Sequence, residues 1–168
     1  FPHNSLRFVA KKELKKGVPA VSPTLRFQRH ALINRKSQFH KTLDELKKLG
    51  RRSKYNTCPV IFPEGTRSRS GKIKSFHTGA FRRVFLENPI PIVSVALNGG
   101  YRFSDVKNII RNLRDGRYDI KILSIYDPPR NKEEISSVLE SCYREIKAQV
   151  EHWQASEKRA LTREGISV

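Results

Sequence analysis

The stretch that decides how this chain folds is Phe62-Pro63-Glu64-Gly65-Thr66-Arg67-Ser68. It follows the apolar run Cys58–Phe62, which is typical of a short buried strand that ends at the proline. Gly65 permits a positive φ, so backbone N–H groups can approach a ligand closely. Arg67 carries a planar fork of donors that matches a phosphate, and the Glu64 carboxylate can fix the direction of that fork. The sequence therefore predicts a phosphate-binding turn at the end of a strand.

Upstream of this turn, the sequence predicts two strands and one helix. Short strands are expected over Arg7–Ala10 and Ala31–Asn34. Apolar residues then recur every three or four positions over Ser37–Leu49, which predicts an amphipathic helix, and Gly50 is expected to close it.

Downstream of the turn, helices and strands continue to alternate. The expected elements are a helix over Thr78–Glu87, a strand over Ile90–Leu97, a helical turn around Val106–Leu113 and a strand over Tyr118–Ile125. This alternation predicts an α/β domain with a central mixed sheet flanked by helices. Ligands of such domains gather at the C-terminal ends of strands, where the Glu64 turn would lie.

The clearest predicted helix comes last in the chain. An apolar stripe runs from Ile135 to Trp153, and Asn131 with Glu134 forms an N-terminal cap. The sequence beyond Trp153 is polar, so we expect the helix to fray there. We accordingly expect a domain over residues 1–155 and a polar C-terminal tail over residues 156–168.

The composition is strongly basic. Among 168 residues, 34 Lys and Arg stand against 16 Asp and Glu, which gives a net charge of +18. Such an excess favours polyanionic partners, namely nucleic acid, an anionic membrane face or phosphorylated substrates, although a basic surface kept for solubility would have the same composition. No apolar stretch approaches the roughly 20 residues that span a bilayer.

The cysteines and the first residue suggest the origin of the chain. Cys58 and Cys142 lie far apart, and we expect both to be small buried side chains in a reducing compartment. The chain begins with Phe1 rather than Met, so we expect it to be an N-terminally incomplete piece of a longer protein.

The seven-residue stretch is identical to the third conserved block of the glycerolipid acyltransferase family, Phe-Pro-Glu-Gly-Thr-Arg-Ser. Other segments resemble further blocks of that family in the same order, over about residues 5–98. Ile33-Asn34-Arg35 is similar to the second block, although Arg29 stands where the family usually has Gly. Pro91-Ile92-Val93 is similar to the fourth block. Phe76–Ala80 resembles a Phe-Lys-x-Gly-Ala segment, with His77 in place of the Lys.

This resemblance implies a glycerol-3-phosphate acyltransferase-like fold and a specific reaction. A fatty acyl chain would pass from acyl-CoA or acyl carrier protein to 1-acyl-glycerol-3-phosphate and form phosphatidate. The acyl donor would be a co-substrate, and neither a cofactor nor a metal is expected. The phosphate-binding residues implied are Glu64, Gly65, Thr66, Arg67 and Arg35, while Pro91 would help to line the acyl site.

The base that the family uses is missing from the sequence. In the family, the His of a His-x-x-x-x-Asp block removes the proton of the acceptor hydroxyl, and the Asp supports that His. No His of this chain has an Asp five positions later, and His40 and Asp44 are better explained as a surface pair on a helix. We therefore expect the catalytic block upstream of Phe1.

Other basic residues near the turn are expected to act less specifically. Lys72 and Lys74 would form an electrostatic funnel rather than make defined contacts. His77 either helps to neutralise substrate charge or faces solvent. As a whole, the basic surface would rest on an anionic membrane at its cytoplasmic face, where the lysolipid resides.

Three other functions could account for a basic chain with such a turn. A nucleotide-binding P-loop fails because five residues rather than four separate Gly65 from Gly71, and Ile73 stands where Ser or Thr should follow the lysine. A nucleic-acid-binding module is disfavoured, since the aromatic residues fall in apolar stripes and no recognised motif appears. A catalytically incomplete remnant that binds lipid phosphate stays open, and the sequence preceding Phe1 would distinguish it from an enzyme.

Overall fold

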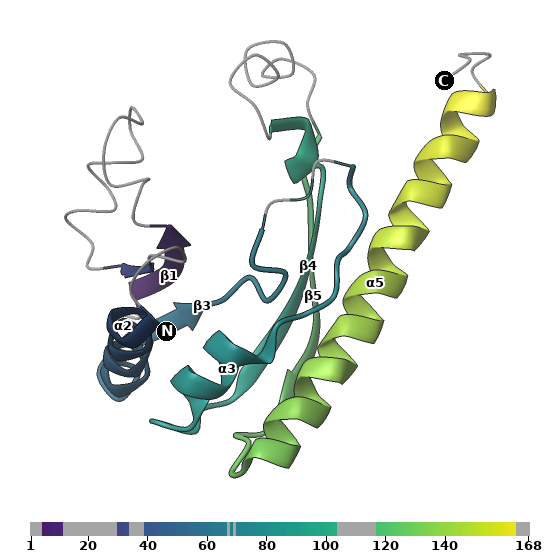
Figure 1. Ribbon diagram of the computed structural model, residues 1–168. Helices are drawn as coiled ribbons and strands as arrows, with labels where there is room; N and C mark the ends of the chain where they lie inside the picture. The colour runs from purple at the N-terminus through teal and green to yellow at the C-terminus, as the bar shows by residue number, and fades with distance from the viewer. Residues whose placement is uncertain are drawn as a thin grey trace. The chain divides into compact units, whose positions relative to one another are not determined.

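A computed structural model of the protein describes residues 5–11, 30–33, 39–66, 68, 70–103 and 117–163. Strands and helices alternate along these residues (Figure 1). The predicted α/β class is confirmed, because parallel and antiparallel strand pairs occur together with helices. The elements are β1 (Ser5–Lys11), β2 (Ala31–Ile33), α2 (Phe39–Arg52), β3 (Thr57–Val60), α3 (Thr78–Phe85), β4 (Ile92–Asn98), the 3-10 helix η2 (Gly100–Phe103), β5 (Asp119–Tyr126) and α5 (Lys132–Arg163).

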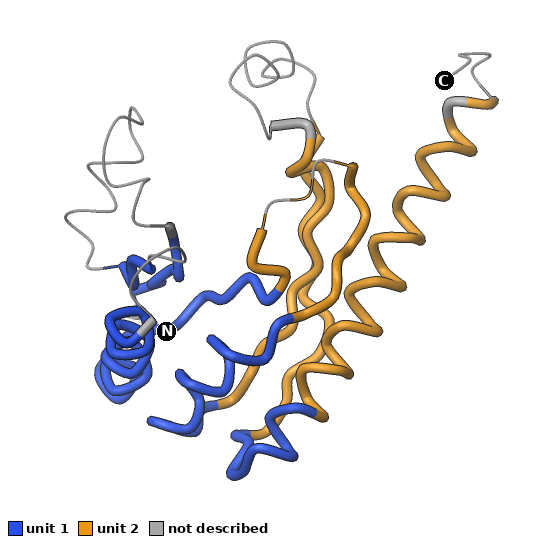
Figure 2. The backbone as a smooth tube through the Cα atoms, in the orientation of Figure 1, with its two compact units in different colours: residues 1–63, 77–90, 128–136 blue, residues 64–76, 91–127, 137–168 orange. Residues whose placement is uncertain are grey.

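The chain divides into two compact units, each with its own sheet (Figure 2). The first unit comprises residues 1–63, 77–90 and 128–136, and it contains the parallel sheet β2-β1-β3. The second unit comprises residues 64–76, 91–127 and 137–168, and it contains the antiparallel pair β4-β5. The expected helical turn around Val106–Leu113 lies outside the described residues.

In the first unit, β1 is the central strand of the parallel sheet. Val9 is the Cα partner of Ala31 in β2, and Leu6 is the partner of Cys58 in β3. The Ser5 N–H also donates to the Asn56 carbonyl at 2.8 Å, which aligns the start of both strands. The two short strands predicted from the sequence are thus confirmed.

Helix α2 runs past the residue that was expected to close it. It continues through Gly50 to Arg52, so the predicted C-terminus was wrong. A Cβ on Gly50 would clash with the Val84 carbonyl oxygen and lie 2.9 Å from the Cβ of Glu87. The glycine therefore permits the backbone of α2 to approach α3 closely. The helix ends two residues later, where the Ser53 hydroxyl donates to the Gly50 carbonyl at 2.5 Å.

Strand β3 is shorter and more open than the sequence suggested. It ends at Val60, and Cys58 is exposed, so the expectation of a buried thiol there was wrong. The reason is that Leu6, its partner in the register, is itself 52% exposed, so this face of the sheet is open to water. Cys142 on α5 is buried as expected, and this burial raises the pKa of its thiol to about 11.

In the second unit, α5 lies along one face of the β4-β5 pair (Figure 1). Side chains of β4 alternate along the strand, and Ile92, Ser94, Ala96 and Asn98 are buried. On α5, the Glu145 carboxylate accepts the Ser124 hydroxyl at 2.6 Å and the Tyr126 hydroxyl at 3.0 Å. These bonds tie the helix to β5, and burial together with the Glu145 bond raises the pKa of Tyr126.

The opposite face of this strand pair is apolar and open. Four of its large side chains are at least half exposed, although they carry no polar atoms. They are Val93, Ile120, Ile122 and Ile125.

Helix α5 begins at the predicted cap and extends further than predicted. The Glu134 N–H donates to Asn131 Oδ1 at 2.8 Å, and the Arg130 N–H donates to the Glu134 carboxylate at the same distance. The fraying expected beyond Trp153 was wrong, since the helix reaches Arg163. The added segment is rich in Ala, Glu, Lys and Arg, which favour helix even where no apolar face is buried.

Candidate phosphate-binding turn

The residues that flank the predicted turn are joined by a backbone hydrogen bond. The His77 N–H donates to the Pro63 carbonyl at 2.8 Å, so the two residues that flank the segment 64–76 are hydrogen-bonded to each other. His77 also precedes the first turn of α3, where its exposed side chain makes no cap hydrogen bond. The residues between therefore form a closed loop, which we call the Glu64–Phe76 loop.

Two features of the start of this loop bear on the predictions. Gly65 has a φ of 69°, so the predicted positive φ is confirmed. The half-buried Glu64 carboxylate accepts the Lys74 backbone N–H at 3.0 Å. Glu64 thus connects the start of the loop to a residue ten positions later.

The Lys74 side chain returns to the turn as well. Its ammonium donates to the Thr66 hydroxyl at 3.4 Å, and both residues are exposed. The expectation that Lys74 makes no defined contacts was therefore wrong. These contacts could not be read from the sequence, because eight and ten residues separate Lys74 from its two partners.

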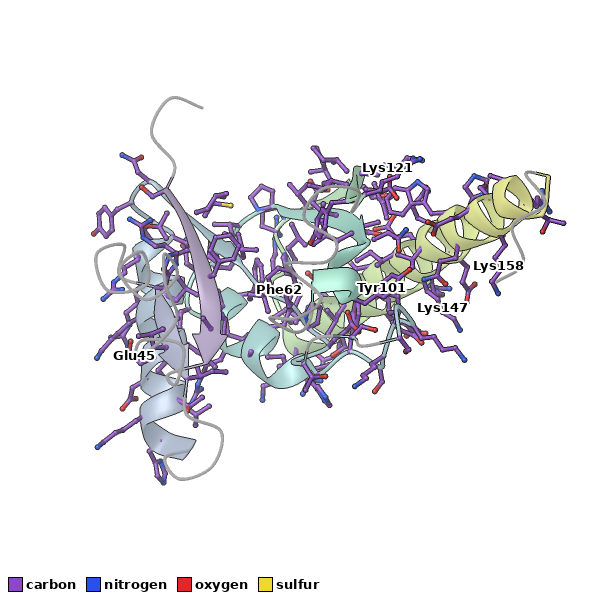
Figure 3. The ribbon with its side chains drawn as sticks, turned by 90° about the horizontal axis from the view of Figure 1, so that it is seen from above. Glu45, Phe62, Tyr101, Lys121, Lys147 and Lys158 are labelled. Carbon is purple, nitrogen blue, oxygen red and sulfur yellow. The ribbon has the colours of Figure 1, made fainter. Side chains whose placement is uncertain are left out.

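The middle of the loop is attached to α5. Gly71 is buried with a φ of 77°, and its carbonyl accepts the Gln154 side-chain amide at 3.0 Å. A Cβ on Gly71 would lie 3.0 Å from the ring of Tyr101, the residue labelled on η2 in Figure 3. Both the backbone angle and the close neighbours therefore require glycine at this position.

A second contact to α5 lies at the end of the loop. The rings of Phe76 and Tyr143 meet edge to face, with centroids 5.1 Å apart. Since Tyr143 and Gln154 lie on the same helix, α5 holds the loop at two points. No motif in the sequence marked either residue, because Tyr143 lies off the apolar stripe of the predicted helix and Gln154 lies in the segment that was expected to fray.

The other predicted phosphate-binding residues are Arg67 and Arg35, and both lie outside the described residues. Their roles, including the orientation of Arg67 by Glu64, stay predictions. Pro91 is exposed just before β4, and its role in an acyl site also stays a prediction.

One histidine, His30, is almost fully buried, at 6% exposed, although no motif in the sequence marks it. Its Nδ1 accepts the Phe8 backbone N–H at 3.0 Å, and burial, followed by the charge of Arg7, lowers its pKa. His40 and Asp44 are exposed on α2, as expected for a surface pair.

In the part of the chain that the structure describes, no three His, Cys, Asp or Glu side chains are grouped so that they could hold a metal ion. The described helices likewise include none with the length and apolar content needed to cross a bilayer.

Comparison of the sequence with known families gives one decisive result. The family described as Acyltransferase matches residues 2–98, which is more than half of the chain. The chain belongs to the acyltransferase family. This match includes β1, β2, β3 and β4 together with the Glu64–Phe76 loop.

This member of the acyltransferase family is also similar to a solved structure, the 1-acyl-sn-glycerophosphate (LPA) acyltransferase PlsC from Thermotoga maritima. The two share 26% sequence identity, with a TM-score of 0.60. The similarity covers 89% of this chain but 57% of the PlsC chain, so the chain spans little more than half of that protein. A comparison with curated proteins found no match.

Proposed function

We propose that the protein transfers a fatty acyl chain from acyl-CoA or acyl carrier protein to the free hydroxyl of 1-acyl-glycerol-3-phosphate, which yields phosphatidate. The observation that carries this proposal is the closed Glu64–Phe76 loop, with its positive-φ Gly65 and its Lys74 cation, in a chain of the acyltransferase family. The similar PlsC structure is that of a 1-acyl-sn-glycerophosphate acyltransferase, which supports the same acceptor.

The loop would hold the phosphate of the acceptor. Arg67 would bind it through two parallel N–H bonds, while Gly65 and Thr66 would supply backbone or hydroxyl donors. Arg35 would add positive charge, and Pro91 would help to line the acyl site. A fixed phosphate would also fix the position of the acceptor hydroxyl relative to the thioester. The two substrates would then react from a defined geometry rather than through a random encounter.

The chemistry also needs a base, which we propose to lie upstream of Phe1 in a His-x-x-x-x-Asp block. The neutral imidazole would take the hydroxyl proton as the oxygen attacks the thioester carbonyl. The carbon–sulfur bond then breaks, and the proton passes to the departing thiolate. In this scheme the acyl donor is a co-substrate and no cofactor takes part.

The acceptor is a lipid, so the site must work at a membrane. We propose that the basic protein rests on the anionic lipids of the cytoplasmic face, where lysolipid is available. Its net charge of +18 supports this location.

The test is acyl transfer by the complete gene product with Arg67→Ala. Losing a paired, charge-assisted contact should lower kcat/KM for lysophosphatidate by about 100-fold. Arg159→Ala is the matched control, because it removes the same charge from an exposed position of α5 and should leave the rate unchanged. Wild-type kinetics for Arg67→Ala would contradict the proposal that Arg67 binds the acceptor phosphate. Binding of lysophosphatidate without any transfer would favour a non-catalytic lipid-phosphate-binding protein.

A further inference from the structure

We propose that Lys74 is a second cation that contacts the acceptor phosphate directly, rather than one charge among many on a basic surface. This inference rests on the proposed function and deepens it, since it names a further ligand of the same phosphate.

The backbone of Lys74 is fixed beside the turn. Its N–H donates to the Glu64 carboxylate at 3.0 Å, so the position of its Cα is tied to the residue that directly precedes Gly65. A hydrogen bond to an ionised acceptor is stronger than one between neutral groups. The backbone of Lys74 therefore has a defined position, although the residue itself is exposed.

The side chain of Lys74 then points back at the same turn. The ammonium donates to the Thr66 hydroxyl at 3.4 Å. An ammonium has three donors, so this bond leaves it able to bind a phosphate oxygen. The Thr66 hydroxyl accepts from Lys74 and can still donate its own proton, so the two groups can act on one anion together.

The charge of Lys74 also serves the site. Glu64 places a negative charge in the turn, and this charge by itself opposes the binding of a phosphate. A cation held at Thr66, two residues from Glu64, offsets that repulsion.

Lys72 shows what a lysine of this loop is like without such contacts. Its backbone carbonyl accepts the Ser68 hydroxyl at 3.1 Å, but its exposed side chain makes no hydrogen bond or ion pair with any residue that the structure describes. Lys72 and Lys74 thus carry the same charge in the same loop and differ in contact with the turn. A comparison of the two lysines can therefore distinguish direct binding of the phosphate from a general electrostatic effect.

The experiment compares Lys74→Ala with Lys72→Ala in the complete enzyme. We expect Lys74→Ala to raise KM for lysophosphatidate by about tenfold, because one charge-assisted contact is lost, while kcat changes less. Lys72→Ala should change KM by less than about twofold, since it weakens only the long-range field. Lys74→Arg, which keeps the charge and the donors, should recover most of the affinity.

Two further readouts exclude a merely structural role. Binding of lysophosphatidate, measured by calorimetry, should weaken with Lys74→Ala, whereas binding of the neutral 1-acylglycerol should not change. The difference between the two alanine variants should also persist at 0.5 M salt, where the Debye length is only about 4 Å and a diffuse field is screened.

Equal effects of the two alanine variants would overturn the role of Lys74 and leave the proposed function standing, provided that Arg67→Ala still lowers kcat/KM by about 100-fold. Equal weakening of charged and neutral lipid by Lys74→Ala would also overturn it. If the complete protein transfers no acyl group, the proposed reaction fails, but the calorimetric comparison still decides whether Lys74 binds the phosphate.

Discussion

His30 is buried beside β1, and its Nδ1 accepts the Phe8 backbone N–H at 3.0 Å. Only the neutral imidazole has a lone pair for this bond, and the neighbouring Arg7 also opposes a positive charge there. Burial is the larger cause, and both lower the pKa of His30 below 6.5. The unfolded chain therefore binds a proton more readily than the folded one.

The first prediction follows from this pKa. Since the folded pKa is depressed, the stabilisation by neutral His30 is fully present above about pH 6.5 and is lost as the pH falls from there toward the folded pKa. Urea unfolding midpoints measured between pH 8 and pH 5 should fall more steeply for the wild type than for His30→Asn, whose amide oxygen can accept without titrating. The exposed His152→Asn serves as control and should keep the wild-type slope. If the unfolding midpoints of the wild type and His30→Asn fall equally with pH, His30 does not contribute to the pH dependence of stability.

Single residues also show where sequence reasoning stops. The positive φ of Gly65 could be predicted, because a local turn needs it. The partners of Lys74 could not, since contacts across eight and ten residues depend on how the loop closes. The burial of His30 was equally hidden, because nothing in its neighbours in the sequence distinguishes a strand start from a polar loop.

Among the elements, α5 has a role beyond packing on the sheet. Its Tyr143 ring meets Phe76, and its Gln154 amide donates to the Gly71 carbonyl at 3.0 Å. A loop with few apolar contacts opens easily unless its backbone is held, so these contacts should keep the Glu64–Phe76 loop closed.

The second prediction concerns this attachment. Gln154→Ala removes a neutral hydrogen bond of about 1 kcal/mol, so amides of the loop should exchange hydrogen about fivefold faster. Hydrogen exchange followed by mass spectrometry of the complete protein would measure this. Gln149→Ala is the matched control, because Gln149 lies on the same helix but accepts from Lys121 at 2.8 Å instead. Equal exchange in both variants would mean that α5 does not restrain the loop.

The helices and strands themselves could largely be predicted. Periodicity placed α2 and α5, and the Asn131 cap was identified correctly. Their ends could not be predicted, because the approach of Val84 to Gly50 lets α2 continue through a glycine. Helix-favouring residues extended α5 without any apolar pattern to reveal it.

For the whole molecule, charge is the dominant property. The net charge is +18, and exposed lysines such as Lys147 and Lys158 extend from α5 (Figure 3). Each Lys or Arg near an anionic bilayer contributes about 1 kcal/mol to binding, an attraction that salt screens.

The third prediction follows from this charge. The protein should bind vesicles that contain phosphatidylglycerol at low salt. Raising the salt from 50 to 500 mM should lower its affinity for these vesicles by about tenfold or more and so release most of the bound protein. Sedimentation with the vesicles measures this, and vesicles of phosphatidylcholine alone are the control. Salt-independent binding to both would contradict an electrostatic attachment. It would point to the apolar face of β4-β5, where Ile122 is 66% exposed.

The α/β class and the family could be predicted at this scale, because seven consecutive residues and the order of further blocks are specific. The faces of the sheets that other elements cover could not be predicted from the sequence. The run Cys58–Phe62 has the composition of a buried strand, yet Cys58 and Phe62 are exposed, since burial depends on what packs against the sheet.

The exposure of Cys58 has a practical consequence. The sequence contains two cysteines, and the other, Cys142, is buried with a thiol pKa of about 11. A maleimide fluorophore or spin label should therefore attach at one place without mutagenesis, at mildly alkaline pH because partial desolvation raises the pKa of Cys58. That place is on β3, the strand that leads into the Glu64–Phe76 loop, so a label there would give a spectroscopic test of whether the proposed lipid substrate changes the surroundings of this strand.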